Sequence, residues 1–308
     1  MISYVVFSLY AVIKLYNRGL YRLKFDFNIL KRSLKYSIPL IPNDMATQIA
    51  VFVSKMFINL NSSLSTVGLF SVASQFGTVV DAVQSSANSA VRPWTFAVLK
   101  KDETDSKREI YNFTVVQFAV YTILFGAVAL FSNEALCLLT SESYHSAGIY
   151  VALIVITYMI KMFYYYKVNL VLFYEKSAKK LFLATTLGSF ANIILCAVLI
   201  PKLGIIGSIG SEFFAMVLRI GILLAISKRF VVVKNHDIKL YIMVIIAIAV
   251  SGIGYFITKI HPEVSLYIIL IKFGLWILLG TIEIFIGIKE IKLFFSSTRK
   301  EPEGSSII

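Results

Sequence analysis

Polar and ionisable side chains recur on two neighbouring apolar segments, at spacings that could serve ligand or ion binding. Within residues 38–60 they are Asp44, Gln48, Lys55 and Asn59. Within residues 66–90 they are Ser74, Asp81, Ser85 and Asn88. Residues three, four or seven apart share one face of a helix. Ionisable groups inside a membrane span are costly and usually face a polar path. The two stripes therefore predict a hydrophilic cleft that binds a charged or polar substrate.

A second interpretation of the same stripes stays open. Polar side chains between helices also hold membrane bundles together by hydrogen bonds. On this interpretation Lys55 pairs with Asp44 or Asp81 and has only a structural role. Two matched stripes on adjacent helices favour the cleft.

Other charged and aromatic residues of the apolar segments have structural explanations. Glu212 and Arg219 are seven apart on one segment and are expected to form a structural ion pair. Lys272 and Glu283 are expected to snorkel to the membrane interface. The tyrosines at 164–166 fit an interfacial aromatic belt.

Motifs of enzymes and metal sites are missing from the sequence. It contains no Gly-rich phosphate loop, HExxH, GxSxG or paired-carboxylate pattern. Cys137 and Cys196 lie far apart, without the spacing of a metal site or disulfide framework. We therefore expect a protein that is not an enzyme and that binds no metal or cofactor.

The apolar segments that carry the polar stripes predict an all-α, polytopic transmembrane bundle of about nine helices. The chain is 58% hydrophobic but only 15% charged, whereas soluble domains are about half apolar and a quarter charged. Eight segments approach the roughly 20 residues that a span needs. They are residues 38–60, 66–90, 111–131, 147–170, 181–200, 205–227, 239–258 and 265–288. Residues 1–13 form a shorter apolar stretch.

The basic residues predict the orientation of the bundle. Of the 30 Lys and Arg residues, only Lys202 and Lys259 fall in loops on one side, and three lie inside spans. The rest occupy the loops of the other side, including a group from Lys161 to Lys180. The positive-inside rule makes that side, and the C-terminus, cytoplasmic. Because the basic residues sit in short loops, the net charge of +13 does not indicate a nucleic-acid binder.

A family resemblance is carried by four stretches in order. They read LKYSIPLIPNDMATQIAVFVSKMFINL, STVGLFSVASQFG, VRPWTFAVLKK and LIPKLGIIGSIGSEFFAMVL. Together they resemble the second half of Wzx-like polysaccharide (O-antigen) flippases of the MATE-related multidrug/oligosaccharidyl-lipid/polysaccharide exporter superfamily. One departure matters: relatives often have an acidic–basic pair where this chain has Ser54 and Lys55.

The resemblance implies a domain organisation. Residues 1–16 would be the remnant of the last first-lobe helix, and residues 17–37 a cytoplasmic basic linker. Residues 38–230 would form the six-helix second lobe, residues 238–288 two accessory terminal helices, and residues 289–308 a cytoplasmic tail. Further helices are expected upstream of Met1.

The resemblance also implies a function. It is the flipping of undecaprenyl-diphosphate-linked oligosaccharide repeat units by alternating access, for O-antigen or capsule biosynthesis at the bacterial inner membrane. Lys55 would attract the diphosphate, and Asp44 or Asp81 would carry a coupling ion. Partners would be the lipid-linked oligosaccharide, membrane lipids, a missing first lobe and polysaccharide assembly proteins. The alternatives are a small-molecule or drug exporter of the same superfamily and a truncated fragment that transports nothing.

Overall fold

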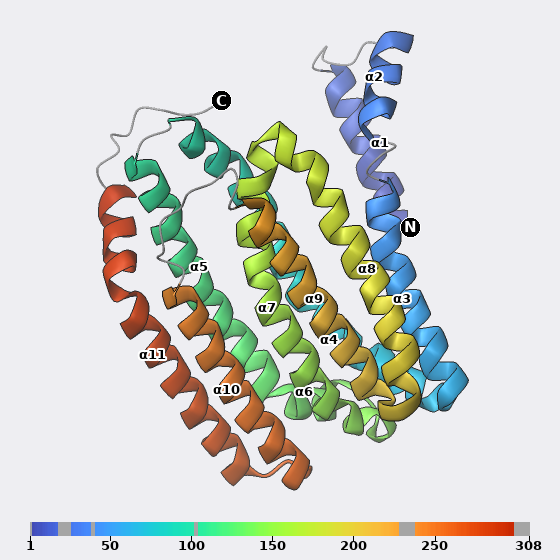
Figure 1. Ribbon diagram of the computed structural model, residues 1–308. Coiled ribbons are helices and arrows are strands. Elements are labelled where there is room, and N and C mark those ends of the chain that lie inside the picture. The colour runs from blue at the N-terminus through green and yellow to red at the C-terminus, as the bar shows by residue number, and fades with distance from the viewer. Residues whose placement is uncertain (1, 18–25, 38–40, 102–103, 228–237, 299–308) are drawn as a thin grey trace. The chain divides into compact units, whose positions relative to one another are not determined.

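Nearly all of the described chain is helical. The structure, a computed structural model, describes residues 2–17, 26–37, 41–101, 104–227 and 238–298 (Figure 1). It is 94% helical, and the described residues contain no strand. The predicted all-α polytopic bundle is therefore confirmed in outline.

The chain divides into two units. The first, Met1–Asp44, contains helices α1 (Ile2–Asn17) and α2 (Phe27–Ser37). Helix α2 lies in the segment predicted as a basic linker. Asp26 precedes it, and its carboxylate accepts hydrogen bonds from the backbone N–H groups of Asn28 at 2.8 Å and Ile29 at 3.3 Å. This is the side-chain cap that a helix N-terminus needs.

The second unit, Met45–Ile308, holds the helical bundle. It begins within α3 (Ile41–Asn61). The remaining elements are α4 (Leu64–Lys100), α5 (Thr104–Leu130), α6 (Ser132–Leu139), the short 3₁₀ helix η2 (Glu142–Ala147), α7 (Gly148–Phe173), α8 (Glu175–Leu203), α9 (Ile205–Ser227), α10 (Ile238–Ile260) and α11 (Leu266–Thr298).

Seven helices are long and apolar enough to cross a membrane: α4, α5, α7, α8, α9, α10 and α11. Each matches one predicted span. The eighth predicted span corresponds to α3, whose residues 49–61 form a shorter apolar helix. The four connections predicted to face the outside, which begin at residues 61, 132, 201 and 260, lie together at one end of the bundle (Figure 1). This arrangement fits the alternation of the basic residues.

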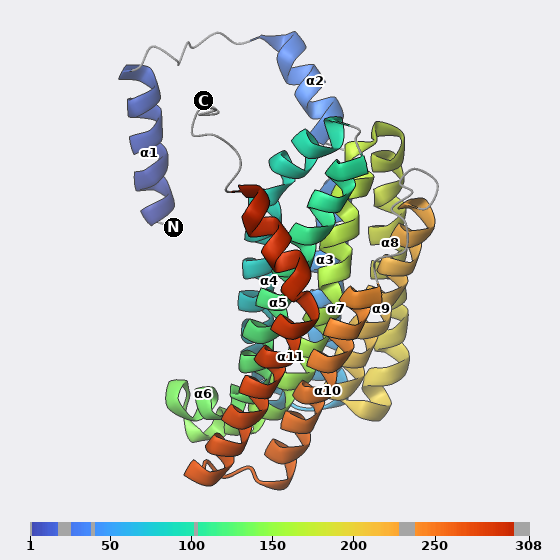
Figure 2. The same ribbon diagram turned by 90° about the vertical axis from the view of Figure 1, so that its left-hand side faces the viewer.

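Helix α7 lies at the centre of the bundle and packs against α4, α5, α8, α9 and α10. Its side chains are apolar on nearly every face, as expected of a helix surrounded by others. Helices α10 and α11 pack on α5 at one side (Figures 1 and 2). The core of the bundle therefore forms around α7, which positions the polar side chains described below.

A tight turn at Gly204 joins α8 to α9. Helix α8 ends at Leu203, and Gly204 has a φ of 56°, a conformation that favours glycine. Its N–H donates to the Ile200 carbonyl at 2.8 Å. A Cβ on Gly207 would come within 2.5 Å of the Leu199 carbonyl oxygen, so α8 and α9 approach closely at this turn.

The connection between the predicted spans 111–131 and 147–170 is mostly helical, as α6 and η2. Glu134 of α6 pairs with Lys272 of α11 at 2.6 Å. The Lys272 side chain is 1% exposed, so the expectation that it snorkels to the interface is wrong. An unpaired ammonium buried in this bundle would be costly, and the carboxylate of Glu134 offsets that cost.

Candidate functional site

A polar cavity of about 360 Å³ lies within the bundle and is partly open. It is bounded by α3, α4, α7 and α9. Its lining comprises Val51, Ser54, Phe70, Ser74, Thr78, Asp81, Ile154, Thr157, Tyr158, Lys161, Ser208, Ile209, Glu212 and Arg219. Two acidic and two basic side chains therefore share one cavity inside an otherwise apolar bundle.

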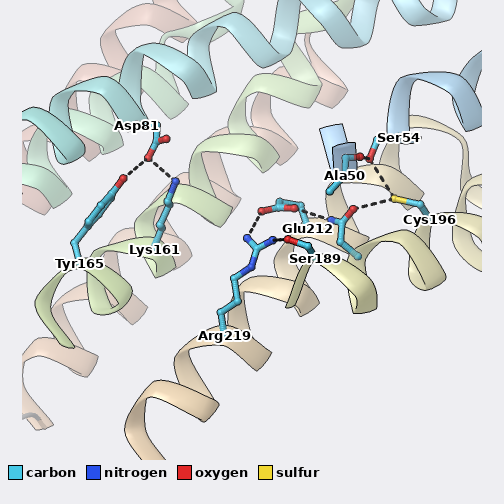
Figure 3. Close-up of polar contacts among 10 residues, drawn as sticks. Ala50, Ser54, Asp81, Lys161, Tyr165, Ser189, Cys196, Glu212 and Arg219 are labelled. Atoms are coloured by element: carbon cyan, nitrogen blue, oxygen red, sulfur yellow. Dashed lines mark hydrogen bonds and ion pairs between the residues drawn. The ribbon is translucent and has the colours of Figure 1, made fainter. Parts of the chain in front are cut away.

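The first charged group joins α4 to α7. The Asp81 carboxylate lies 2.6 Å from the Lys161 ammonium, and the same oxygen accepts a hydrogen bond from the Tyr165 hydroxyl at 3.1 Å (Figure 3). The ammonium also lies over the rings of Tyr158 and Tyr165, 5.3 and 5.4 Å from their centroids. Cation–π contact and ion pairing together hold the Lys161 ammonium in position between α4 and α7.

The second charged group joins α9 to α8. Arg219 donates to Glu212 at 3.0 Å and to the Ser189 hydroxyl at 3.2 Å (Figure 3). Asn192 of α8 donates to the other Glu212 oxygen at 2.6 Å. The expected pair between Glu212 and Arg219 is therefore confirmed. It belongs to a wider network that includes α8.

The network continues from α8 to α3. The Cys196 thiol donates to the Asn192 side-chain oxygen at 3.4 Å and lies 3.2 Å from the Ser54 hydroxyl. Ser54 in turn donates to the Ala50 carbonyl at 2.9 Å. A chain of polar contacts thus runs from Arg219 through α8 to α3, one of the helices that bound the cavity.

Gly188 of α8 makes room for Arg219. A Cβ at this position would come within 2.2 Å of Cγ and 2.5 Å of Nε of Arg219. The arginine side chain is consequently only 6% exposed, whereas Glu212 is 38% exposed toward the cavity. The absence of a side chain at residue 188 therefore fixes the position of the guanidinium.

Both charged groups lie near the middle of their helices. Charge at such depth is expensive unless it is paired and hydrogen-bonded. Here each cation has an anion within 3.0 Å, and the two pairs are neutral in sum. The cavity can therefore hold polar or charged groups of a ligand at a level where the surrounding bundle is apolar.

Among the residues of the two predicted stripes with described side chains, Ser74 and Asp81 line this cavity. Lys55 and Asn59 are not among its lining residues, and Asn59 is exposed. Ser54 lines it instead, because neighbouring residues on a helix point about 100° apart. Asp81 pairs with Lys161 and not with Lys55, so the structural pair considered for these two residues is wrong.

The remaining predicted residues fall elsewhere. Asp44 and Gln48 belong to α3, but their side chains lie outside the described part of the structure. The Ser85 hydroxyl donates to the Ala82 carbonyl at 3.2 Å, within its own helix. Asn88 accepts a hydrogen bond from the Asn169 amide of α7 at 2.7 Å, away from the cavity. The α4 stripe thus divides between the cavity and a contact with α7.

The sequence analysis missed two residues of the site, Lys161 and Tyr165. It assigned Lys161 and Lys167 to a cytoplasmic group and Tyr165 to an aromatic belt. The assignment of the lysines to a loop is wrong, because both lie within α7, where Lys167 is buried. Tyr165 lies on the same helix and donates to Asp81. A usable signal was present: Lys161 lies midway along a 26-residue apolar helix, as Asp81 lies midway along α4.

The chemistry of the cavity is that of binding. Hydroxyl, ammonium, guanidinium and carboxylate groups surround it, and no group of three or more possible metal-ligating side chains occurs among the described residues. No family model matches the chain, and no curated protein or solved structure matches it.

Proposed function

We propose that this chain is a membrane transport protein, or the second lobe of one, that moves an amphipathic substrate with an anionic head across the bacterial inner membrane. The observation that carries the proposal is the partly open cavity, lined by two ion pairs near the middle of its helices. Ionisable residues at such depth usually serve a substrate or ion path.

Undecaprenyl-diphosphate-linked oligosaccharide, the substrate class that the sequence resemblance implies, fits this chemistry. The ammonium of Lys161 and the guanidinium of Arg219 would attract the diphosphate. Tyr158, Ser74 and Thr78 offer a ring and hydroxyls to sugars. The polyprenyl chain would remain in lipid. In this proposal the cationic role passes from Lys55 to the two residues that line the cavity.

The same cavity supports the proposed movement. Each cationic side chain is already paired, so an anionic head would bind by competing with Asp81 or Glu212. In this proposal Asp81 is the residue that binds the coupling ion, because a cation on its carboxylate would compete with Lys161 and so change how available Lys161 is to the substrate.

A small-molecule exporter is the second candidate, favoured by the volume of the cavity. About 360 Å³ is near the lower end of the roughly 300–1,000 Å³ of small-molecule pockets. An oligosaccharide head would need space beyond this cavity, supplied by opening or by another lobe. A small cationic solute would fit beside Asp81 and Glu212 without either.

The test is flipping of a fluorescent polyprenyl-diphosphate-linked saccharide in proteoliposomes. Lys161→Met should abolish flipping, whereas Lys202→Met, a change in the last turn of α8 that does not touch the cavity lining, should leave it unchanged. Full activity of Lys161→Met would refute the role of the cavity. Uptake of a lipophilic cation in place of the saccharide would favour the exporter, and no movement of either would favour a chain that transports nothing by itself.

A further inference from the structure

A carboxyl group without a hydrogen-bond partner lies between α11 and its neighbours, apart from the cavity. Glu283, near the middle of α11, is 0% exposed. Neither of its oxygens has a partner in the described part of the chain. The expectation that this side chain snorkels to the interface is therefore wrong, and its burial needs another explanation.

Helices α5 and α11 pack closely on either side of Glu283. A Cβ on Gly126 of α5 would come within 2.5 Å of the Leu279 side chain of α11. A Cβ on Gly287 of α11 would come within 3.1 Å of Val115 of α5. Leu279 and Gly287 lie one turn before and one turn after Glu283. The carboxyl is thus enclosed on both sides by close contacts between α5 and α11.

No charged residue is placed to neutralise Glu283 from the helices that pack on α11, which are α5 and α10. Residues 110–130 of α5 and 240–258 of α10 contain no Lys, Arg, His, Asp or Glu. Their titratable residues are tyrosines: Tyr111, Tyr121, Tyr241 and Tyr255. The Thr122 hydroxyl of α5 lies within interaction range of the Glu283 carboxyl. Because it donates to the Phe118 and Ala119 carbonyls at 2.9 and 3.1 Å, it can only accept a hydrogen bond from Glu283, which the acid form alone could donate.

The charged residues of α11 itself are also accounted for. Lys272 pairs with Glu134, and Glu290 pairs with Lys239 at 2.7 Å. Lys289 is exposed. None of the described cations therefore forms an ion pair with Glu283.

We propose that Glu283 binds a proton, and that the α5–α11 interface is a proton-binding site separate from the cavity. An unpaired carboxylate in an apolar enclosure is far more costly than the neutral acid. The acid form persists while α11 stays packed on α5. When the interface opens, the O–H bond breaks, the proton passes to water, and the carboxylate that remains opposes closure. The inference does not depend on what the cavity binds.

Infrared spectroscopy of the reconstituted protein tests the proposal, because a protonated carboxyl has a carbonyl stretching band that a carboxylate lacks. At neutral pH the wild-type protein should show this band, and Glu283→Gln should remove it. Glu290→Gln is the matched control: Glu290 is buried on the same helix but paired with Lys239, so its removal should leave the band intact. A band that survives Glu283→Gln, or none in the wild-type protein, would overturn the proposal.

A second variant guards against misfolding of the first. Glu283→Leu places an apolar side chain in the apolar enclosure, where no hydrogen bond is needed. This variant should therefore fold and also lack the band. The thermal midpoint in detergent is a further readout. In the wild-type protein it should fall as pH rises, because opening is favoured once the proton is lost, and it should fall less in Glu283→Leu. Equal pH dependence in both proteins would contradict the site.

Discussion

Substitution of Gly188 by alanine should displace Arg219 and weaken the α8–α9 part of the site. The added methyl group would come within 2.2 Å of Cγ of Arg219, a distance at which one of the two must move. Because the arginine side chain is 6% exposed and held by Glu212 and Ser189, its displacement breaks contacts with both. The variant therefore tests whether the guanidinium position depends on the missing side chain.

The expected magnitude has three parts. Overpacking of a filled interior costs about 1–3 kcal/mol. Loss of the Glu212 contact adds about 1 kcal/mol, a low value because that carboxylate is 38% exposed. Alanine in place of glycine within a helix returns about 1 kcal/mol. The net effect of Gly188→Ala is a destabilisation of about 1–3 kcal/mol.

Thermal unfolding of the detergent-solubilised protein measures this effect. Gly221→Ala is the matched control, since a Cβ there meets nothing within 4 Å and the change should stabilise α9 by about 1 kcal/mol. In an Arg219→Ala background, Gly188→Ala should become neutral or stabilising, because the clashing atoms are gone. If Gly188→Ala is as stable as Gly221→Ala, the inference that residue 188 positions Arg219 is refuted.

Three further predictions concern the Asp81–Lys161 pair, the Glu134–Lys272 pair and Cys137 of α6. Lys161→Met and Asp81→Asn should each lower the thermal midpoint, and their double mutant should show a coupling energy of about 1–2 kcal/mol; a value near zero would contradict the pairing. Lys272→Met should cost about 3–5 kcal/mol by leaving Glu134 unpaired, and Glu134→Gln should recover most of that loss in the same thermal assay; an unchanged midpoint would speak against the pair. Burial, reinforced by the carboxylate of Glu134, raises the pKa of the Cys137 thiol, whereas Lys272 acts in the opposite sense. The thiolate fraction at neutral pH is therefore reduced, so labelling by an impermeant maleimide should quicken as pH rises and should be faster in Glu134→Gln; a rate that ignores both changes would exclude this account.

The spans could be predicted because the signal for each is local. A run of about 20 apolar residues needs no partner to be identified, and α4, α5 and α7–α11 each carry one. Helical segments outside these apolar runs are harder to predict from the sequence. Helix α6 begins with two polar residues that are held by tertiary contacts. The Ser132 hydroxyl donates to the Gly148 carbonyl at 3.1 Å, and Asn133 donates to the Pro262 carbonyl at 3.0 Å. Such partners lie too far along the chain for a local pattern to reveal.

The site was only partly predictable for the same reason. Asp81 stood out as an acid within an apolar segment, but its partner lies 80 residues away on α7. Counting basic residues by loop predicts an orientation, yet it assigns any lysine near a span end to water, and so it placed Lys161 in a loop when the residue lies within α7. Adjacent residues on a helix point about 100° apart, so either Lys55 or Ser54 of α3 can face the cavity. The spacing of polar residues alone does not decide between them.

Three polar contacts along α4 have a consequence for how this helix can slide. Asp81 bonds Lys161, Gln84 donates to the Tyr158 carbonyl at 2.9 Å, and Asn88 accepts from Asn169. Apolar helices in lipid gain little from one sliding position over another, because every position offers similar surfaces. A shift of α4 by one turn, about 5.4 Å, would break all three contacts at once. Movement of α4 along α7 would thus be all-or-none, with Asp81 either fully seated in the cavity or withdrawn from it.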